Sequence, residues 1–483
     1  MLIRFPLAIP LPGFIIPLAS ANDWAQFRGF IGGVAMDAQL PTQWSTDQNI
    51  QWKTEIPGYG WSQPIIVGDK VFVTTAITKD QKRTQATRFP GGEDPREQGG
   101  PGVPPPGNRP PPGAFPSGPG QGRPPAFGGP GGARGPGGPF GMGPPDAIYQ
   151  WKIYCLDRLT GQEIWNALAF EGTPTIGIEQ SNTYASQTPL ADNDRLYAYF
   201  GMTGIFCFDL NGKLLWSKDL GSYPVMFGPG SSPAMDDERV FVQCDNDEQS
   251  FLVALDKKSG DEVWRVDRDE RSNYSTPYVW RNKIRTELVT CGDTVRSYDP
   301  ATGKLFWEFK NFGGGVKPSP VGDADRLCVC NSGRGNGSNS PIVMFIAGAS
   351  GDISLKDNET SNTGVLWRVS PGGGGMASPL MYQGCVYVLQ QNGGILGCYD
   401  ANTGERYYRQ RLRNATEFWS SPWAAAGKVY CLDSDGQTFV FEAGPELKIV
   451  ATNSLDDNFR SSVAIAHGQI LFRGVDRLYS VTE

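Results

Sequence analysis

Histidine is almost absent from this sequence of 483 residues, in which His467 is the only one. A metal site built from several histidines is therefore excluded, and a Ser-His-Asp triad would depend on this single residue. The nine cysteines include no adjacent pair and no Cys-x-x-Cys-His motif. A covalently attached c-type haem is thus excluded as well.

An excess of positive charge is also missing. The chain has 43 Lys and Arg against 50 Asp and Glu, which gives a formal net charge of −7. A phosphate backbone would meet an acidic protein, so the composition predicts no nucleic-acid partner.

The longest apolar run lies at the N-terminus. Arg4 precedes an apolar stretch over residues 5–18, and Ala19-Ser20-Ala21 follows as a small-x-small cleavage pattern. We therefore expect residues 1–21 to be a signal peptide and the protein to be periplasmic or secreted. The run is short and broken by prolines, so we expect no integral membrane segment after cleavage; an uncleaved anchor is the alternative.

Glycine and proline are abundant, with 62 and 39 residues, and they dominate the stretch from Pro90 to Pro145. This stretch lacks a strict triplet period and has little apolar surface to bury. We expect residues 81–148 to form a disordered Pro/Gly-rich insertion within the first structural repeat.

The remainder is organised by a Ser/Thr-rich tripeptide that ends in proline and recurs about every 43 residues, with one large and one small insertion. The eight copies are Ser62–Pro64, Gln187–Pro189, Ser231–Pro233, Ser275–Pro277, Pro318–Pro320, Ala377–Pro379, Ser420–Pro422 and Ser461–Val463. A turn and a β-rich triplet follow each copy, which predicts a hairpin of two short strands.

A second hairpin follows. An apolar run ends at an Asp and is followed by a Gly, as at Asp157 and Gly161, and both residue types favour a tight turn. An aromatic residue stands three or four positions after this glycine, and we expect each unit to bury it on a fourth strand. The aromatic residues are Trp165, Trp216, Trp264, Trp307, Trp367 and Tyr408.

Four short antiparallel strands cannot bury a face alone, and radial stacking is the economical closed arrangement. We predict an all-β, eight-bladed β-propeller with tryptophan-docked four-stranded blades over residues 22–483. The last unit ends after three strands, so we expect the segment around Trp52 to complete the eighth blade. A seven-bladed ring is the alternative, because the eighth unit lacks the proline and the seventh lacks its tryptophan.

The unit Ala/Cys-Leu-Asp-x-x-Thr-Gly-x-x-x-Trp resembles the tryptophan-docked repeats of the pyrroloquinoline-quinone (PQQ) propeller superfamily. That superfamily includes quinoprotein alcohol dehydrogenases and the assembly factor BamB. The opening Asp23-Trp24-Ala25-Gln26-Phe27-Arg28-Gly29 is similar to a secreted group of PQQ-binding-like propeller proteins. Quinoprotein alcohol dehydrogenases carry an adjacent Cys-Cys pair, which this chain lacks.

Two residue patterns have a structural explanation. Cys155, Cys207 and Cys398 occupy a slot that holds Ala254 in another unit, which predicts a small buried strand position with free thiols. The clusters Asp192–Asp194 and Asp245–Asp247 supply too few oxygen ligands for calcium, so we expect solvated turns and no metal site.

The residues three positions before each proline are the candidate binding site, because first strands line the axis of a propeller. Trp61, Tyr274 and Trp419 offer aromatic faces there, and Lys317 and Arg460 offer positive charge. Together they suit a planar anionic ligand. The alternative is that bulky side chains only plug the axis.

These features favour a non-catalytic binding or assembly scaffold at the cell envelope, with protein or envelope-polymer partners on its loop faces. The alternative is a PQQ-dependent alcohol or sugar dehydrogenase, for which the resemblance implies PQQ with Ca²⁺ as cofactors. No catalytic residue is assigned by the sequence.

Overall fold

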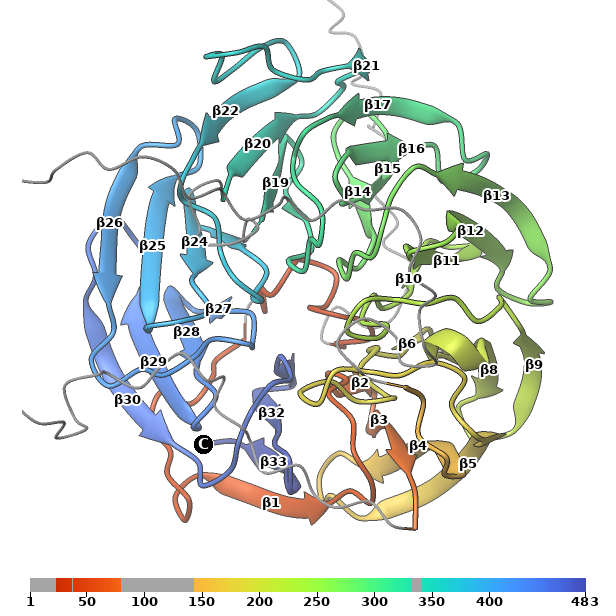
Figure 1. Ribbon diagram of the computed structural model, residues 1–483. Coiled ribbons are helices and arrows are strands. Elements are labelled where there is room, and N and C mark those ends of the chain that lie inside the picture. The colour runs from red at the N-terminus through yellow and green to blue at the C-terminus, as the bar shows by residue number, and fades with distance from the viewer. Residues whose placement is uncertain (1–22, 37, 80–142, 332–339) are drawn as a thin grey trace, which may run out of the picture.

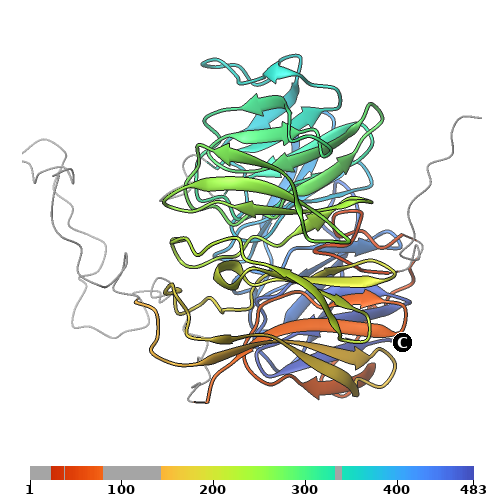
Figure 2. The same cartoon turned by 90° about the vertical axis from the view of Figure 1, so that its right-hand side faces the viewer.

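The computed structural model describes residues 23–36, 38–79, 143–331 and 340–483. The strands of these residues form eight sheets around a central axis, so the predicted all-β, eight-bladed propeller is confirmed (Figure 1). Figure 2 shows the same ring edge-on, as a thick disk. The expected signal peptide, residues 1–21, lies outside the described residues. Most of the Pro/Gly-rich insertion that we expect to be disordered also lies outside them; only its end, residues 143–148, is described.

Each blade has four strands in antiparallel order, and its first strand lies nearest the axis (Figure 1). The strands of blades one to four are β2 Ile65–Val67, β3 Lys70–Ile77, β4 Tyr149–Asp157 and β5 Glu163–Gly172; β6 Leu190–Ala191, β7 Arg195–Tyr199, β8 Ile205–Asp209 and β9 Leu214–Lys218; β10 Ala234–Met235, β11 Arg239–Cys244, β12 Ser250–Asp256 and β13 Glu262–Arg268; β14 Tyr278–Arg281, β15 Thr286–Thr290, β16 Val295–Tyr298 and β17 Leu305–Phe309.

The strands of blades five to eight are β18 Val321–Gly322, β19 Arg326–Cys330, β20 Ile342–Ile346 and β22 Val365–Val369; β23 Leu380–Tyr382, β24 Cys385–Leu389, β25 Ile395–Asp400 and β26 Arg406–Arg411; β27 Trp423–Ala425, β28 Lys428–Leu432, β29 Gln437–Glu442 and β30 Ile449–Ser454; β31 Ala464–Ala466, β32 Gln469–Arg473, β33 Arg477–Val481 and β1 Ile50–Glu55. Among the described residues, a 3₁₀ turn at Gly201–Thr203 interrupts this pattern.

Both insertions of the repeat are placed by these bounds. Residues 78–148 connect the second and third strands of blade one, as the spacing predicts. The extra length of blade five lies partly at the corresponding connection and partly between β20 and β22. In the latter connection, β21 Gly351–Asp352 pairs in parallel with β17 and adds a fifth strand to the edge of blade four.

The N-terminal strand closes the ring. β1 pairs antiparallel with β33, so it is the fourth strand of blade eight, as predicted. Trp52 on this strand packs against the turn of blade one, where its indole N–H donates to the carbonyl of Arg158 at 2.8 Å. A Cβ at Gly161, where φ is +69°, would approach the Trp52 ring to 2.5 Å, so this turn requires glycine.

The same docking recurs between other blades. The indoles of Trp165, Trp216, Trp264 and Trp367 each donate to a backbone carbonyl in the turn of the following blade. The expectation that every such aromatic is buried is wrong for Trp165, Trp216 and Trp264, which are half-buried. They lie on the outermost strand, where the turn of the next blade and one aromatic ring of their own blade cover part of the indole.

Trp307 differs because the additional strand β21 lies beside it. Its partner in the parallel pairing is Gly351, and its ring centroid lies 4.9 Å from that of Phe345 in blade five. Its indole N–H donates to Glu287 Oε2 at 2.7 Å, and both residues are fully buried.

The third-strand slot opposite the docking aromatic is small in blades one, two, three and six, as predicted, whereas Met344 occupies it opposite Trp367 in blade five. Cys155 pairs with Trp165, Cys207 with Trp216, Ala254 with Trp264 and Cys398 with Tyr408. All three cysteines are buried thiols, and burial contributes to raising the pKa of each. In Cys398 the neighbouring Cys385 contributes more to this shift than burial does.

Replacing Trp307 by Ala should lower the free energy of unfolding by about 4–5 kcal/mol, because a fully buried indole and its bond to Glu287 are lost. Trp264→Ala should cost about 2 kcal/mol, since part of that indole is already in water. Chemical denaturation of both variants checks this order. Equal losses would contradict the difference in burial.

Candidate binding site at the propeller axis

The first strands are joined around the axis by one repeated hydrogen bond. The backbone N–H of the residue before each proline donates to the hydroxyl of the equivalent residue in the next blade, at 2.9–3.1 Å. The seven bonds run in order through Gln63, Thr188, Ser232, Thr276, Ser319, Ser378, Ser421 and Ser462. Gln63 closes the circle, because its side-chain amide donates to the carbonyl of Val463 at 2.5 Å. We call these eight residues the hydroxyl ring.

The hydroxyl ring fixes the position of the residues two places before it. All eight of these residues line one cavity of about 600 Å³ at the axis, with the hydroxyl ring in its wall. They are Trp61, Ser186, Gly230, Tyr274, Lys317, Met376, Trp419 and Arg460. The structure therefore brings the five candidate site residues together, whereas their role in binding stays a prediction.

Arg460 lies between two of the aromatic residues. Its guanidinium carbon is 4.6 Å from the ring centroid of Trp419 and 5.7 Å from that of Trp61. Arg460 Nη1 and Trp61 Nε1 both donate to the carbonyl of Ser181, each at 2.9 Å. Burial lowers the pKa of Arg460, and Glu417 and Glu179 oppose this shift. One face of each indole is therefore in contact with Arg460 and is not open to a ligand.

The other candidate residues form a second cluster across the mouth. Lys317 Nζ lies 5.7 Å from the Tyr274 ring centroid and donates to the carbonyl of Gly315 at 3.2 Å. The Tyr274 ring is 6.4 Å from that of Phe227, and its hydroxyl donates to the carbonyl of Met226. The mouth is therefore two aromatic–cation clusters rather than a uniform aromatic belt.

Several lining residues come from outside the repeat and were missed from the sequence. Glu179 and Asn182 lie in the long connection between β5 and β6, and Phe227 lies between β9 and β10. Among the described lining residues, Glu179 carries the only carboxylate, and it accepts the backbone N–H of Ser181 at 2.7 Å. Blades six and seven have no counterpart of the β5–β6 connection, so the repeat alignment gave no signal for it.

The N-terminal segment 23–36 crosses the ring beside first strands, as the red stretch near the centre of Figure 1 shows. Trp24 exchanges backbone hydrogen bonds with Ile66 of blade one, and Ala35 donates to Ala424 of blade seven. Phe27 lines the cavity from this side. We call residues 23–36 the tongue. The expected axial channel is therefore a cup whose floor is the tongue.

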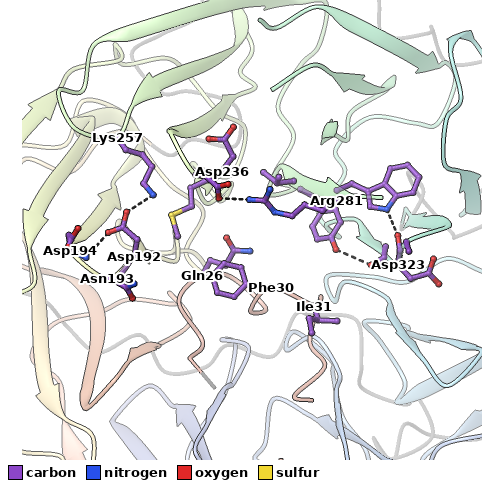
Figure 3. Close-up of a pocket in the computed structure, with 18 residues that line it drawn as sticks. Gln26, Phe30, Ile31, Asp192, Asn193, Asp194, Asp236, Lys257, Arg281 and Asp323 are labelled. Carbon is purple, nitrogen blue, oxygen red and sulfur yellow. Dashed lines mark hydrogen bonds and ion pairs between the residues drawn. The ribbon is translucent and has the colours of Figure 1, made fainter. Parts of the chain in front are cut away.

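A second cavity, of about 460 Å³, lies on the other side of the tongue (Figure 3). Phe30 and Ile31 of the tongue line it, together with turns of blades two to five. Two of its carboxylates form ion pairs, since Asp192 pairs with Lys257 at 2.6 Å and Asp237 pairs with Arg281 at 3.0 Å.

The two acidic clusters of the sequence have different environments. Asp192 accepts the backbone N–H groups of Asp194 and Arg195 in a hairpin turn, in agreement with a turn role. The expectation of a solvated turn is wrong for Asp245, which is buried and pairs with buried Arg268 at 2.8 Å. Arg268 lies at the end of β13, 23 residues after Asp245. No local pattern in the sequence predicts this pairing.

The lining of the cup does not fit a bound Ca²⁺. This ion takes six to eight oxygen ligands with carboxylates among them, and the described lining supplies one carboxylate, Glu179. Over residues 23–36, 38–79, 143–331 and 340–483, no group of three His, Cys, Asp or Glu side chains is placed to hold a metal ion. The PQQ–Ca²⁺ pair of the dehydrogenase alternative therefore lacks a matching donor set in the cup.

Known proteins show the same repeat and fold. The family model described as outer membrane protein assembly factor BamB matches residues 151–283 and 349–445. A europium-containing methanol dehydrogenase superposes with a TM-score of 0.54 at 12% identity, over 95% of this chain and 89% of that chain. Quinohemoprotein alcohol dehydrogenase from Comamonas testosteroni gives 0.50 at 11% identity, over 70% and 73%. BamB from Moraxella catarrhalis gives 0.37 at 11% identity, over 62% and 94%.

No curated protein matches the sequence. At these identities, the two dehydrogenases show a shared fold and nothing of the chemistry.

Replacing Arg460 by Met should lower the free energy of unfolding by about 1–2 kcal/mol, because two cation–π contacts and a bond to Ser181 are lost. Lys317→Met is the matched control and should cost less than about 1 kcal/mol, since its contact with Tyr274 is long. Urea denaturation measures both. A larger loss for Lys317 would contradict the sandwich geometry.

Proposed function

Because the chain is a PQQ-like β-propeller repeat protein, we propose that it is a non-catalytic binding or assembly scaffold of the cell envelope, which holds its partner at the mouth of the cup. The observation that carries this proposal is the convergence of eight blades on one cavity. A cavity of about 600 Å³ with a closed floor suits the capture of a side chain or a small group rather than passage along the axis.

The chemistry of the cup favours an anionic group on the partner. The seven hydroxyls of the hydroxyl ring each accept a backbone N–H, and among the described residues their own O–H groups have no acceptor. They are therefore donors that line the wall of the cup. Lys317 and Arg460 add positive charge at the rim, and aromatic rings beside them suit a planar anion.

Export to the periplasm or beyond belongs to this proposal. It is supported by the N-terminal sequence pattern and by the match to an outer membrane assembly factor. Among the described residues, no helix has the length and apolar character needed to cross a membrane. We propose that the partner is a protein or a polymer of the cell envelope.

Reversing the charge at the rim should weaken partner binding. Lys317→Glu should lower affinity for a planar anion, with PQQ as the probe, by about five- to hundredfold through loss of one charge-assisted contact. Lys304→Glu is the matched control, because it makes the same charge change at an exposed turn away from the axis. Titration calorimetry compares the two variants with the unaltered protein.

The same preparations test the enzymatic alternative. Protein incubated with PQQ and Ca²⁺ should not reduce a dye in the presence of an alcohol panel. Alcohol-dependent dye reduction with submicromolar PQQ affinity would overturn the scaffold proposal. Equal PQQ affinity of the Lys317→Glu and Lys304→Glu variants would contradict a binding site at the mouth of the cup.

A further inference from the structure

Four arginines are buried among the described residues, and three of them have good partners. Arg158 donates to Gln469 Oε1 at 2.6 Å and pairs with Asp69 at 2.9 Å. Arg268 binds both carboxylate oxygens of Asp245, at 2.8 and 3.1 Å. Arg473 donates to the carbonyls of Ser62 and Thr74, at 3.1 and 2.8 Å. Arg28 of the tongue is only 3% exposed, yet its Nε and Nη1 atoms have no hydrogen-bond partner among the described residues. Its Nη2 makes one long contact of 3.4 Å, to the carbonyl of Pro422.

The backbone around Arg28 is held firmly, so the side chain has little freedom to move to solvent. Its N–H donates to Gln63 Oε1 at 2.9 Å, and its carbonyl accepts the N–H of Gly33 at 2.7 Å. A Cβ at Gly33 would approach Arg28 Nη2 to 2.8 Å, so the tongue folds closely over the guanidinium.

Within the described part of the chain, no charged group compensates this guanidinium. The titratable groups that act on it are Tyr278, Cys328 and Cys330, and burial raises the pKa of all three, so they are neutral at neutral pH. Burial lowers the pKa of Arg28 to about 10, which leaves it protonated under the same conditions. A buried and unpaired cation is strongly unfavourable unless a counter-charge is supplied.

A small cavity of about 20 Å³ lies beside Arg28, between the tongue and blades three to five. Thr276 and Ser319 of the hydroxyl ring line it together with Arg28. Both hydroxyls already accept a backbone N–H, so their O–H groups remain available as donors. This volume is enough for one water molecule or one monatomic anion.

We propose that this cavity binds a monatomic anion, namely chloride, between Arg28 and the hydroxyls of Thr276 and Ser319. Arg28 and the two hydroxyls supply the donors that an anion site requires, and most of the other described lining residues are apolar. The anion supplies the counter-charge for Arg28 and ties the tongue to blades four and five. A water molecule of the same size accepts hydrogen bonds but leaves the charge of Arg28 uncompensated, so the test must separate the two.

Thermal unfolding of the full chain in a chloride series tests the site. Ionic strength is held constant with gluconate, a large organic anion. Between about 1 mM and about 300 mM chloride, the melting temperature should rise by about 2–5 °C along a binding curve, and bromide should substitute for chloride. A melting temperature that follows only ionic strength would overturn the proposal.

Arg28→Met should abolish the chloride dependence, because its volume is similar and its charge is gone. Arg473→Met is the matched control: it also removes a buried arginine at the ring, and its melting temperature should still rise with chloride. Loss of the dependence in both variants, or in neither, would contradict an anion held by Arg28.

Crystals of the unaltered protein grown in bromide provide a readout that does not require a folded variant. An anomalous peak should lie within hydrogen-bond distance of Arg28 and of the Thr276 and Ser319 hydroxyls. Density without anomalous signal at that position identifies water and overturns the proposal.

Discussion

The circle of hydrogen bonds from backbone N–H to the hydroxyl of the next blade is the constraint on which the rest of this structure depends. The donor of each bond is the backbone N–H of the residue before the proline. This residue precedes the first strand, so its N–H is not used in the hydrogen bonds of the sheet. A Ser or Thr side chain is short enough to hold neighbouring first strands at one separation. Repeated from blade to blade, this bond sets the radius of the ring and the position of the cup's wall.

The outer side of the ring is held by a different interaction. Indoles on the fourth strands dock against glycine turns of the following blade, and Trp52 makes the last of these contacts on a strand from the other end of the chain. The hydroxyl ring therefore determines where side chains meet at the axis. The indoles connect adjacent blades at the outer edge of the propeller. The tongue closes the axis, and it is held to the hydroxyl ring where the Arg28 N–H donates to Gln63.

The sequence predicted those features that the repeat encodes. The proline register placed Trp61, Tyr274 and Lys317 at the mouth, because equivalent residues of all blades occupy equivalent positions around the axis. It also identified Trp52 as a fourth-strand residue. The small slot at Cys155 followed from the Ala254 equivalent, since both face a docking indole across the sheet.

Features outside the repeat were not predictable in this way. The tongue has no equivalent in other units, so nothing indicated that Phe27 closes the cup or that Arg28 is buried. The stacking of Arg460 between two indoles depends on side-chain directions from three blades, which sequence spacing does not specify. The half-burial of Trp264 reflects its place at the outer edge, whereas Trp307 gains cover from a strand that belongs to the next blade's connection.

Amide hydrogen exchange at Thr276 tests most directly whether the hydroxyl circle holds the blades. The Thr276 N–H donates to Ser319 Oγ at 2.9 Å. Ser319→Ala should accelerate exchange of this amide at least about tenfold, because a buried donor loses its acceptor. Ser319→Thr is the control and should retain slow exchange, since Thr already occupies this position in two blades. Unchanged exchange at Thr276 in Ser319→Ala would contradict the account.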